Sequence, residues 1–241
     1  MCKAEAMRIG ILGGTGPAGT ALGARLASVG YDVTLGSRSK YRAMEVVDGI
    51  LAHWPDYDLA MDASDNEGAA SADVVVLATP WDSAATTAHA LEKQLNGKVV
   101  VSMANALVRV GHEFQPLVPP RGSVAAHVQA AVPRCRVVAA FHHLPAKELG
   151  HLGEPIDSDV LICGDDGAAV KSVAEIVAKI PGCRPLEAGE LSNAMAIEAF
   201  TAVLLQLNVR YKTRVAPKLT GIKTKPAAAP PAPPVELEPS A

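Results

Sequence analysis

Short apolar runs alternate with segments of helical periodicity along most of the chain. The first run, residues 8–12, predicts a β-strand, and it leads into a helix on which Leu22, Leu26 and Val29 share one face. Continuous apolar runs further along are typical of strands that are buried on both faces of a parallel sheet. Additional strands are expected at residues 32–35, 58–61, 73–78, 98–102, 136–140 and 160–163, and additional helices at residues 41–51, 83–95, 124–131, 168–179 and 190–210.

A glycine-rich turn separates the first strand from the first helix. It reads Gly-Gly-Thr-Gly-Pro-Ala-Gly over residues 13–19, and Gly14, Gly16 and Gly19 fit the G-x-G-x-x-G pattern. In that pattern the first two glycines permit a tight turn and close approach of a pyrophosphate, and the third lets the helix pack against the strand. Pro17 suits the first helical position, and the helix N-terminus favours an anion. The turn therefore predicts a dinucleotide site.

The segment after the second strand indicates which dinucleotide binds. An NAD site usually presents a carboxylate to the ribose 2′-hydroxyl about twenty residues beyond the glycines, but residues 36–40 read Gly-Ser-Arg-Ser-Lys. Ser37 offers a hydroxyl, Arg38 a planar guanidinium that can bind a phosphate through two nitrogens, and Lys40 a point charge. We therefore expect NADP(H) rather than NAD(H).

The order of the elements predicts an α/β protein of the Rossmann type, with a doubly wound, mostly parallel sheet. We expect residues 1–148 to form the NADP-binding Rossmann domain and residues 149–223 a smaller C-terminal α/β domain with a long apolar helix. Core burial, a dimer interface or a cofactor wall would each explain that helix's apolar face. Residues 224–241 are rich in proline and alanine and predict a disordered tail.

Three loops follow strands that should be neighbours in this sheet, at residues 79–81, 103–105 and 141–145. Ligands bind beyond the carboxyl ends of parallel strands, so these loops should lie along one edge with the glycine-rich turn. We expect them to frame the nicotinamide ring.

Composition and charge limit the classes of partner that the chain is expected to bind. With 241 residues, of which 49% are hydrophobic, the chain can bury a full core, and a net charge of -3 gives no reason to expect a nucleic acid or an anionic membrane. The first residues lack a signal peptide's apolar core, and the most apolar stretch, 199–209, is too short to cross a bilayer. The cysteines lack the spacing of a metal site. We expect a cytoplasmic protein with small-molecule partners and no metal.

Together the motifs resemble one family, the NADPH-dependent reductases of the deazaflavin coenzyme F-420, also called coenzyme F-420:NADP oxidoreductases. The resemblance covers most of residues 7–222. The motifs that carry it are Leu-Gly-Gly-Thr-Gly at 12–16, Gly-Ser-Arg at 36–38, Thr-Pro-Trp at 79–81, His-His-Leu-Pro-Ala at 142–146, Cys-Gly-Asp-Asp at 163–166, Arg-Pro-Leu-Glu-Ala-Gly at 184–189 and Leu-Ser-Asn at 191–193. The resemblance implies a cytosolic enzyme, usually a homodimer, that passes a hydride between NADP(H) and coenzyme F-420.

The resemblance also implies roles for single residues. Thr15 and the glycines would hold the pyrophosphate, and Ser37, Arg38 and Lys40 the 2′-phosphate. His142 would line the pocket for hydride transfer together with Leu144.

The remaining cofactor-binding residues come from the loops at the sheet edge and from the last helix. Pro80 and Trp81 would flank the nicotinamide and the ribose, and Thr201 would face the cofactor cleft. Thr79 and Asn105 complete the set.

Hydride exchange between nicotinamide C4 and deazaflavin C5 needs few protein groups, because the protein must mainly stack two planar rings and exclude water. A proton must also join or leave the deazaflavin, and His142 is the candidate for orienting or protonating it. The other interpretation of His142 and His143 is that both are loop residues bonded to the backbone.

The start of the last helix differs at one position from a segment of another enzyme family. Residues 189–196 resemble the Gly-x-x-x-Asn-x-x-Lys segment of β-hydroxyacid dehydrogenases, but Ala196 stands where their catalytic lysine would be. Alanine cannot deliver the proton that a carbonyl oxygen needs as hydride arrives. Reduction of F-420 by NADPH is therefore expected. The alternatives are an NADPH-dependent imine or ketone reductase and a non-catalytic protein that senses NADP(H).

Overall fold

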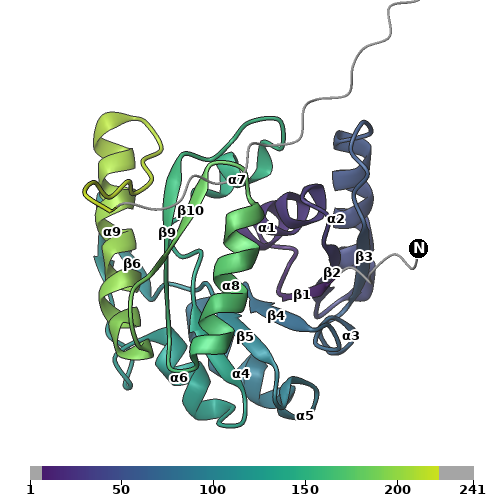
Figure 1. Cartoon of the computed structure of the whole chain (residues 1–241), viewed down its shortest axis with the longest axis horizontal. Helices are drawn as coiled ribbons and strands as arrows, with labels where there is room; N and C mark the ends of the chain where they lie inside the picture. Colours follow the sequence, from purple (N-terminus) through teal and green to yellow (C-terminus); the bar gives the residue numbers. More distant parts are fainter. Residues whose placement is uncertain (1–6, 223–241) are drawn as a thin grey trace, which may run out of the picture.

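The computed structural model describes residues 7–222, in which helices and strands alternate along the chain (Figure 1). The N-terminal half contains β1 (Arg8–Leu12), α1 (Pro17–Ser28), β2 (Asp32–Ser37), α2 (Lys40–His53), β3 (Met61–Asp65), α3 (Asn66–Ala69), β4 (Val74–Leu77), α4 (Trp81–Ala90), α5 (Glu92–Leu95) and β5 (Val99–Ser102). The C-terminal half contains β6 (Leu107–Val110), β7 (Glu113–Pro116), α6 (Val124–Ala131), β8 (Arg136–Ala139), α7 (Ala146–Gly150), β9 (Ser158–Gly164), α8 (Gly167–Lys179), β10 (Cys183–Glu187), the 3-10 helix η1 (Leu191–Asn193) and α9 (Ala194–Tyr211).

One sheet joins eight of these strands in the order β10-β9-β8-β5-β4-β1-β2-β3. From β3 to β8 all neighbours are parallel, in the strand order of a doubly wound Rossmann sheet. β9 pairs antiparallel with β8, and β10 pairs parallel with β9. The predicted Rossmann-type, mostly parallel sheet is confirmed.

Helices cover both faces of the sheet, and successive strand residues point to opposite faces. Ile9 and Ile11 belong to the core beneath α1, α2 and α8, whereas Val75 and Leu77 belong to the core beneath α4 and α6. Figure 1 shows α1 and α2 above the strands β1 and β4, and α4 and α6 below them. Burial on both faces is the reason that the central strands are continuous apolar runs.

Several predicted boundaries were wrong. The third strand begins at Met61 and not at residue 58, because this edge strand is only half buried and lacks an apolar run. The helix expected at 83–95 is divided into α4 and α5, and α4 starts two residues earlier, at Trp81.

Short elements of the C-terminal half were not predicted from the sequence pattern. The strands β6 and β7 form a mostly exposed antiparallel hairpin, so they carry no alternation of buried and exposed positions. The strand β10 was not predicted; it contains Pro185, which an edge strand tolerates. The helix α7 has only five residues, too few for helical periodicity.

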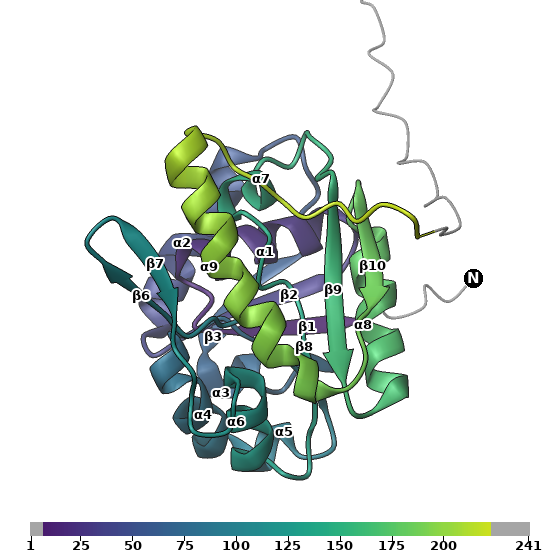
Figure 2. The same cartoon turned by 90° about the vertical axis from the view of Figure 1, so that its left-hand side faces the viewer.

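The residues from 149 to 222 continue the same sheet through β9 and β10. The domain boundary expected at residue 148 falls inside α7, and the division into two domains stays a prediction. Figure 2 shows α9 between the β6–β7 hairpin and β9. The proline-rich tail, 224–241, lies outside the described residues. Within residues 7–222, no helix combines the length and apolar character needed to cross a membrane.

Candidate functional site

The strands β1, β4, β5 and β8 end at the same edge of the sheet. In their register Leu12 pairs with Leu77, Leu77 with Ser102, and Ser102 with Ala139. The glycine-rich turn and the three loops that follow β4, β5 and β8 therefore meet at this edge, which in doubly wound sheets is the ligand-binding edge. The structure brings together the segments that the sequence predicted to be neighbours.

Hydrogen bonds to its backbone groups fix the glycine-rich turn. The N–H of Gly13 donates to Asn66 Oδ1 at 3.2 Å, and the N–H of Gly14 donates to Gly36 O at 2.8 Å. The Thr20 hydroxyl donates to Gly14 O at 3.0 Å. Gly13 has a φ of +69°, a conformation that favours glycine. Sequence analysis missed Gly13, although its place before the G-x-G pattern was a signal, and missed Asn66 because the third strand was misplaced.

The glycines of the turn serve different purposes. A Cβ on Gly19 would lie 2.8 Å from Gly14 Cα, so this glycine permits the close approach of α1 to the turn. A Cβ on Gly16 would meet only Gly13 O, at 3.8 Å, so the space above Gly16 is open. Pro17 is the first residue of α1, as predicted, and Gly16 is its N-cap. Open space in front of a helix N-terminus without acidic residues in its first turn fits a pyrophosphate.

A groove of about 630 Å³ lies along α1 and α2. Two residues of the predicted pyrophosphate site, Thr15 and Pro17, line it together with Arg42 and Trp54. The open space at the turn thus continues toward α2.

The residues predicted to bind the 2′-phosphate lie where β2 passes into α2. Ser37 is buried, and its hydroxyl accepts the N–H of Ser39 at 3.3 Å. Arg38 and Lys40 are exposed, and neither forms an ion pair with any residue between 7 and 222. Both cations are free to meet an anionic group, and this arrangement fits a phosphate.

At the sheet edge, four side chains hold buried polar atoms that find no hydrogen-bond partner in the described part of the chain. These atoms are Thr79 Oγ1, Ser102 Oγ, Asn105 Oδ1 and both ring nitrogens of His142. A buried polar atom without a partner costs about 1–3 kcal/mol, so native structures rarely keep several together. These side chains therefore fit a ligand that supplies the missing partners.

The backbone of His142 connects three elements of the site. Its carbonyl oxygen accepts Asn105 Nδ2 at 3.0 Å and the Thr201 hydroxyl of α9 at 3.4 Å. The preceding residue, Phe141, is fully buried with a φ of +65°. A non-glycine residue in this region is strained, and such strain is concentrated at functional sites.

The two adjacent histidines differ in environment. Burial, and to a smaller extent the charge of His143, lowers the pKa of His142 to about 3, so its ring is neutral at physiological pH. His143 Nε2 lies 2.9 Å from Asp159 O and 3.3 Å from Leu161 N. The interpretation as a backbone-bonded loop histidine therefore describes His143, whereas the ring of His142 makes no such bond within residues 7–222.

The remaining predicted residues lie at the same edge. Leu144 is buried, and its N–H donates to Phe141 O at 3.3 Å, which closes the loop after β8. Pro80 is the N-cap of α4, and Trp81, its first residue, packs in part against the core.

A buried carboxylate anchors α9 beside the site. Glu198, one helical turn before Thr201, accepts the N–H groups of Val124 at 2.8 Å and Ala125 at 3.1 Å. Burial raises the pKa of Glu198 to about 7, although both hydrogen bonds oppose the shift. Because these N–H groups belong to the first turn of α6, the carboxylate fixes α9 to α6 and thereby sets the position of Thr201.

A second buried charge was invisible to sequence analysis. Arg25 of α1 is completely buried and donates to the backbone carbonyls of Glu148, Leu149, His151, Leu152 and Glu154, at distances of 2.5 to 3.2 Å. Burial lowers its pKa. These bonds fasten the helix that follows the glycine-rich turn to the segment that follows the His142 loop.

Several proteins are similar to this chain in sequence or in fold. A family model described as "NADP oxidoreductase coenzyme F420-dependent" matches residues 8–106. The "F420-dependent NADP reductase" of Methanocaldococcus jannaschii is 36% identical over 222 residues, covering 90% of this chain and 97% of the relative. The protein of the same name from Methanothermobacter thermautotrophicus is 32% identical over 223 residues, covering 89% and 94%. A crystal structure from Arthrobacter sp. FB24, described as a candidate F420-dependent NADP-reductase, superposes with a TM-score of 0.70 at 25% identity, covering 88% of this chain and all of that chain.

Proposed function

The chain belongs to the family of F420-dependent NADP reductases, and we propose from this premise that the described sheet edge transfers a hydride between NADP(H) and coenzyme F-420. The observation that carries the proposal is the group of buried, unpartnered polar atoms at Thr79, Asn105 and His142, which lie beyond neighbouring strand ends. The nicotinamide supplies the hydride at C4, and the deazaflavin accepts it at C5.

Two groups of residues would bind the phosphates of the dinucleotide. The N–H groups at the start of α1 and the open space above Gly16 would receive the pyrophosphate. Ser37, Arg38 and Lys40 would bind the 2′-phosphate, because a hydroxyl and two exposed cations lie there without competing ion pairs among the described residues. The nicotinamide would then reach the loops after β4, β5 and β8.

We assign His142 an orienting role. A neutral imidazole carries one N–H donor and one acceptor, and both ring nitrogens lack partners within residues 7–222. A ring of low pKa is a poor source of protons at neutral pH. Its N–H can hold a ring carbonyl or ring nitrogen of the bound substrate in place, while solvent supplies the proton.

This assignment predicts that His142 leaves no mark on the pH profile. The pKa of His142 is lowered to about 3, so its protonation does not change between about pH 5 and 8, and kcat/KM for F-420 should show no inflection from it. His142→Gln retains an N–H donor and cannot titrate, so it should preserve the shape of the profile. His89→Gln, an exposed histidine, serves as the control. An inflection near pH 6.5 that disappears only in His142→Gln would assign the proton to this ring instead.

The last helix favours a conjugated ring over a carbonyl as hydride acceptor. Ala196 is exposed and offers no proton, and the Asn193 amide is engaged with Ala188 O at 2.6 Å. Neither residue can assist a ketone as a lysine would. Reduction of F-420 by NADPH is thus preferred over ketone reduction, and less strongly over imine reduction, because an iminium arrives already protonated. Turnover of a ketone or imine without deazaflavin would favour the alternative.

We infer that the protein acts in the cytoplasm as a homodimer. Large apolar side chains stay exposed on α9, namely Met195, Phe200, Val203 and Val209. The neighbouring hairpin adds Val110, which is also exposed. A second copy of the chain would cover such a surface. Light scattering during size-exclusion chromatography should give twice the mass of 24.9 kDa.

The proposed reaction has a direct spectroscopic test. Purified protein mixed anaerobically with NADPH and F-420 should bleach the visible absorbance of the deazaflavin in step with NADPH oxidation. Tight NADPH binding without oxidation by F-420 would instead support the non-catalytic sensor.

A further inference from the structure

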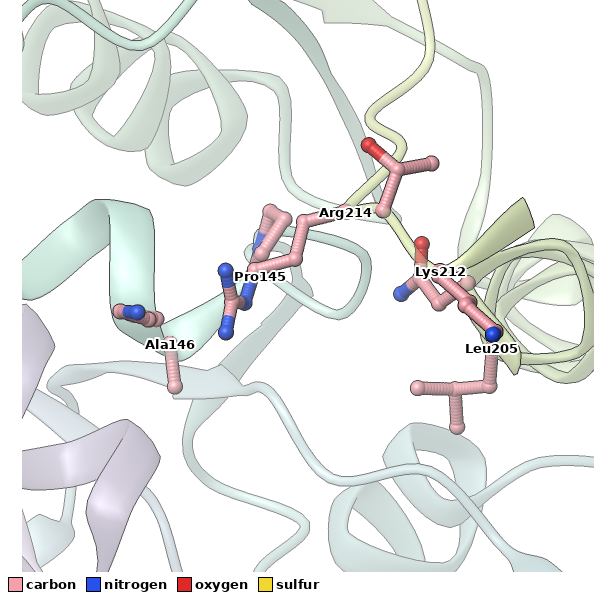
Figure 3. Close-up of a pocket in the computed structure, with 8 residues that line it drawn as sticks. Pro145, Ala146, Leu205, Lys212 and Arg214 are labelled. Atoms are coloured by element: carbon pink, nitrogen blue, oxygen red, sulfur yellow. The ribbon is translucent and has the colours of Figure 1, made fainter. Parts of the chain in front are cut away.

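A cationic cavity of about 360 Å³ lies between the start of α7 and the C-terminal part of α9. Figure 3 shows Pro145 on one side of the cavity, Leu205 and Lys212 on the other, and Arg214 between them. Lys147 also lines it. Three of the lining residues are therefore cationic. Among the described residues that line the cavity, none is acidic.

One nearby carboxylate offsets part of this charge. Glu148 Oε1 lies 3.5 Å from Arg214 Nη1, and the other carboxylate oxygen is buried and meets no donor in residues 7–222. Lys147 and Lys212 are exposed and form no ion pair with a described residue. Two positive charges thus remain without a counter-charge beside the cavity.

The backbone turn after α9 positions two of the cations. Lys212 adopts a left-handed conformation with φ of +52°, and its N–H donates to Asn208 O. The Asn208 side-chain oxygen accepts the N–H of Val215 at 2.6 Å. Asn208 therefore holds both sides of a turn that returns Arg214 to the cavity. A lysine in this strained region is uncommon, because glycine or asparagine would be the ordinary choice.

Both the cavity and the candidate active site lie against α9. Thr201, Leu205 and Asn208 follow a spacing of four and three residues, so they share one face of the helix, and Lys212 comes directly after its last residue. From Thr201 to the end of the helix at Tyr211, α9 rises by about 15 Å. At the other wall, Pro145 lies three residues beyond His142, whose carbonyl oxygen accepts the Thr201 hydroxyl.

We propose that this cavity binds the anionic side chain of the deazaflavin substrate, which carries a phosphodiester and carboxylates beyond a ribityl chain. The inference rests on the proposed function, because it places the deazaflavin ring at His142 and Thr201. From there the ribityl chain follows the shared face of α9, and the anionic groups reach Lys147, Lys212 and Arg214. Flexible ammonium groups suit a chain of several anions, since each acts as a point charge without a fixed geometry.

The test compares the binding of two deazaflavins, measured by fluorescence titration without turnover. One is coenzyme F-420, and the other is its truncated form, which ends at the ribityl alcohol. The wild type should bind F-420 more tightly than the truncated compound, and added salt should reduce this advantage. The double variant Lys147→Gln/Lys212→Gln should weaken F-420 binding by about tenfold, while affinity for the truncated compound and for NADPH stays within about twofold. Lys93→Gln/Lys171→Gln, on α5 and α8, should change neither.

The possible failures are distinguishable. A wild type that binds both deazaflavins equally, with no effect of salt on their ratio, overturns the cavity proposal alone. Equal losses for both compounds in the double variant, or a loss of NADPH affinity, overturn it as well. A wild type that binds neither deazaflavin contradicts the proposed function itself.

Discussion

Replacing Arg25 by methionine is expected to lower the free energy of unfolding by about 3–5 kcal/mol. The guanidinium is completely buried and donates to five backbone carbonyls between residues 148 and 154. Methionine fills a similar volume but donates no hydrogen bond, so several buried carbonyls lose their partners, at about 1–3 kcal/mol for each that water cannot reach. Arg25→Lys retains the charge but not the fork of donors, and it should recover only part of the loss.

Urea unfolding measures this change, and a matched substitution controls for loss of an arginine. Arg136 is exposed and donates to one carbonyl, that of Gly97, at 2.8 Å. Arg136→Met should therefore cost less than about 1 kcal/mol. If Arg25→Met unfolded at the urea concentration of the wild type, the five bonds would not hold α1 to α7 and the segment after it.

Replacing Arg38 by alanine should raise KM for NADPH by about tenfold to a hundredfold, with little change in kcat. This range corresponds to about 1.5–3 kcal/mol for hydrogen bonds between a guanidinium and a phosphate. NADH lacks the 2′-phosphate, so its KM should stay nearly constant, and the preference for NADPH should fall by the same factor. Steady-state kinetics with both dinucleotides give the two ratios directly.

Arg134→Ala provides the control, because Arg134 is exposed and precedes β8, at the opposite edge of the sheet. It should leave the preference for NADPH unchanged. An unaltered preference in Arg38→Ala would mean that the 2′-phosphate binds elsewhere, and the interpretation of residues 36–40 would then be wrong.

The parts of the fold that depend on local chemistry could be predicted from the sequence. β1 and the helix that starts at Pro17 lie where the apolar run and the glycine pattern placed them. The central strands were predictable because burial on both faces selects continuous apolar runs. The loop positions at residues 79–81 and 103–105 followed from strand order alone, since parallel neighbours end at one edge.

Features that depend on distant contacts could not be predicted. Arg25 looks like an ordinary polar residue of a surface helix, and its acceptors lie 123 to 129 residues further along the chain. The unusual pKa of His142 arises mainly from burial, and only to a smaller extent from its neighbour His143. The cationic cavity likewise combines Lys147 with residues 212–214, which only the path of α9 brings together.

The central claim is that one ring hands its hydride directly to the other at the edge of the sheet. NADPH carrying deuterium at C4, prepared separately as each of its two diastereomers, tests this claim when the reduced deazaflavin is examined by mass spectrometry. Direct transfer predicts that one diastereomer delivers its deuterium to C5 of the deazaflavin in ordinary water and that the other delivers none. Reduced deazaflavin that carries no deuterium from either diastereomer would contradict it.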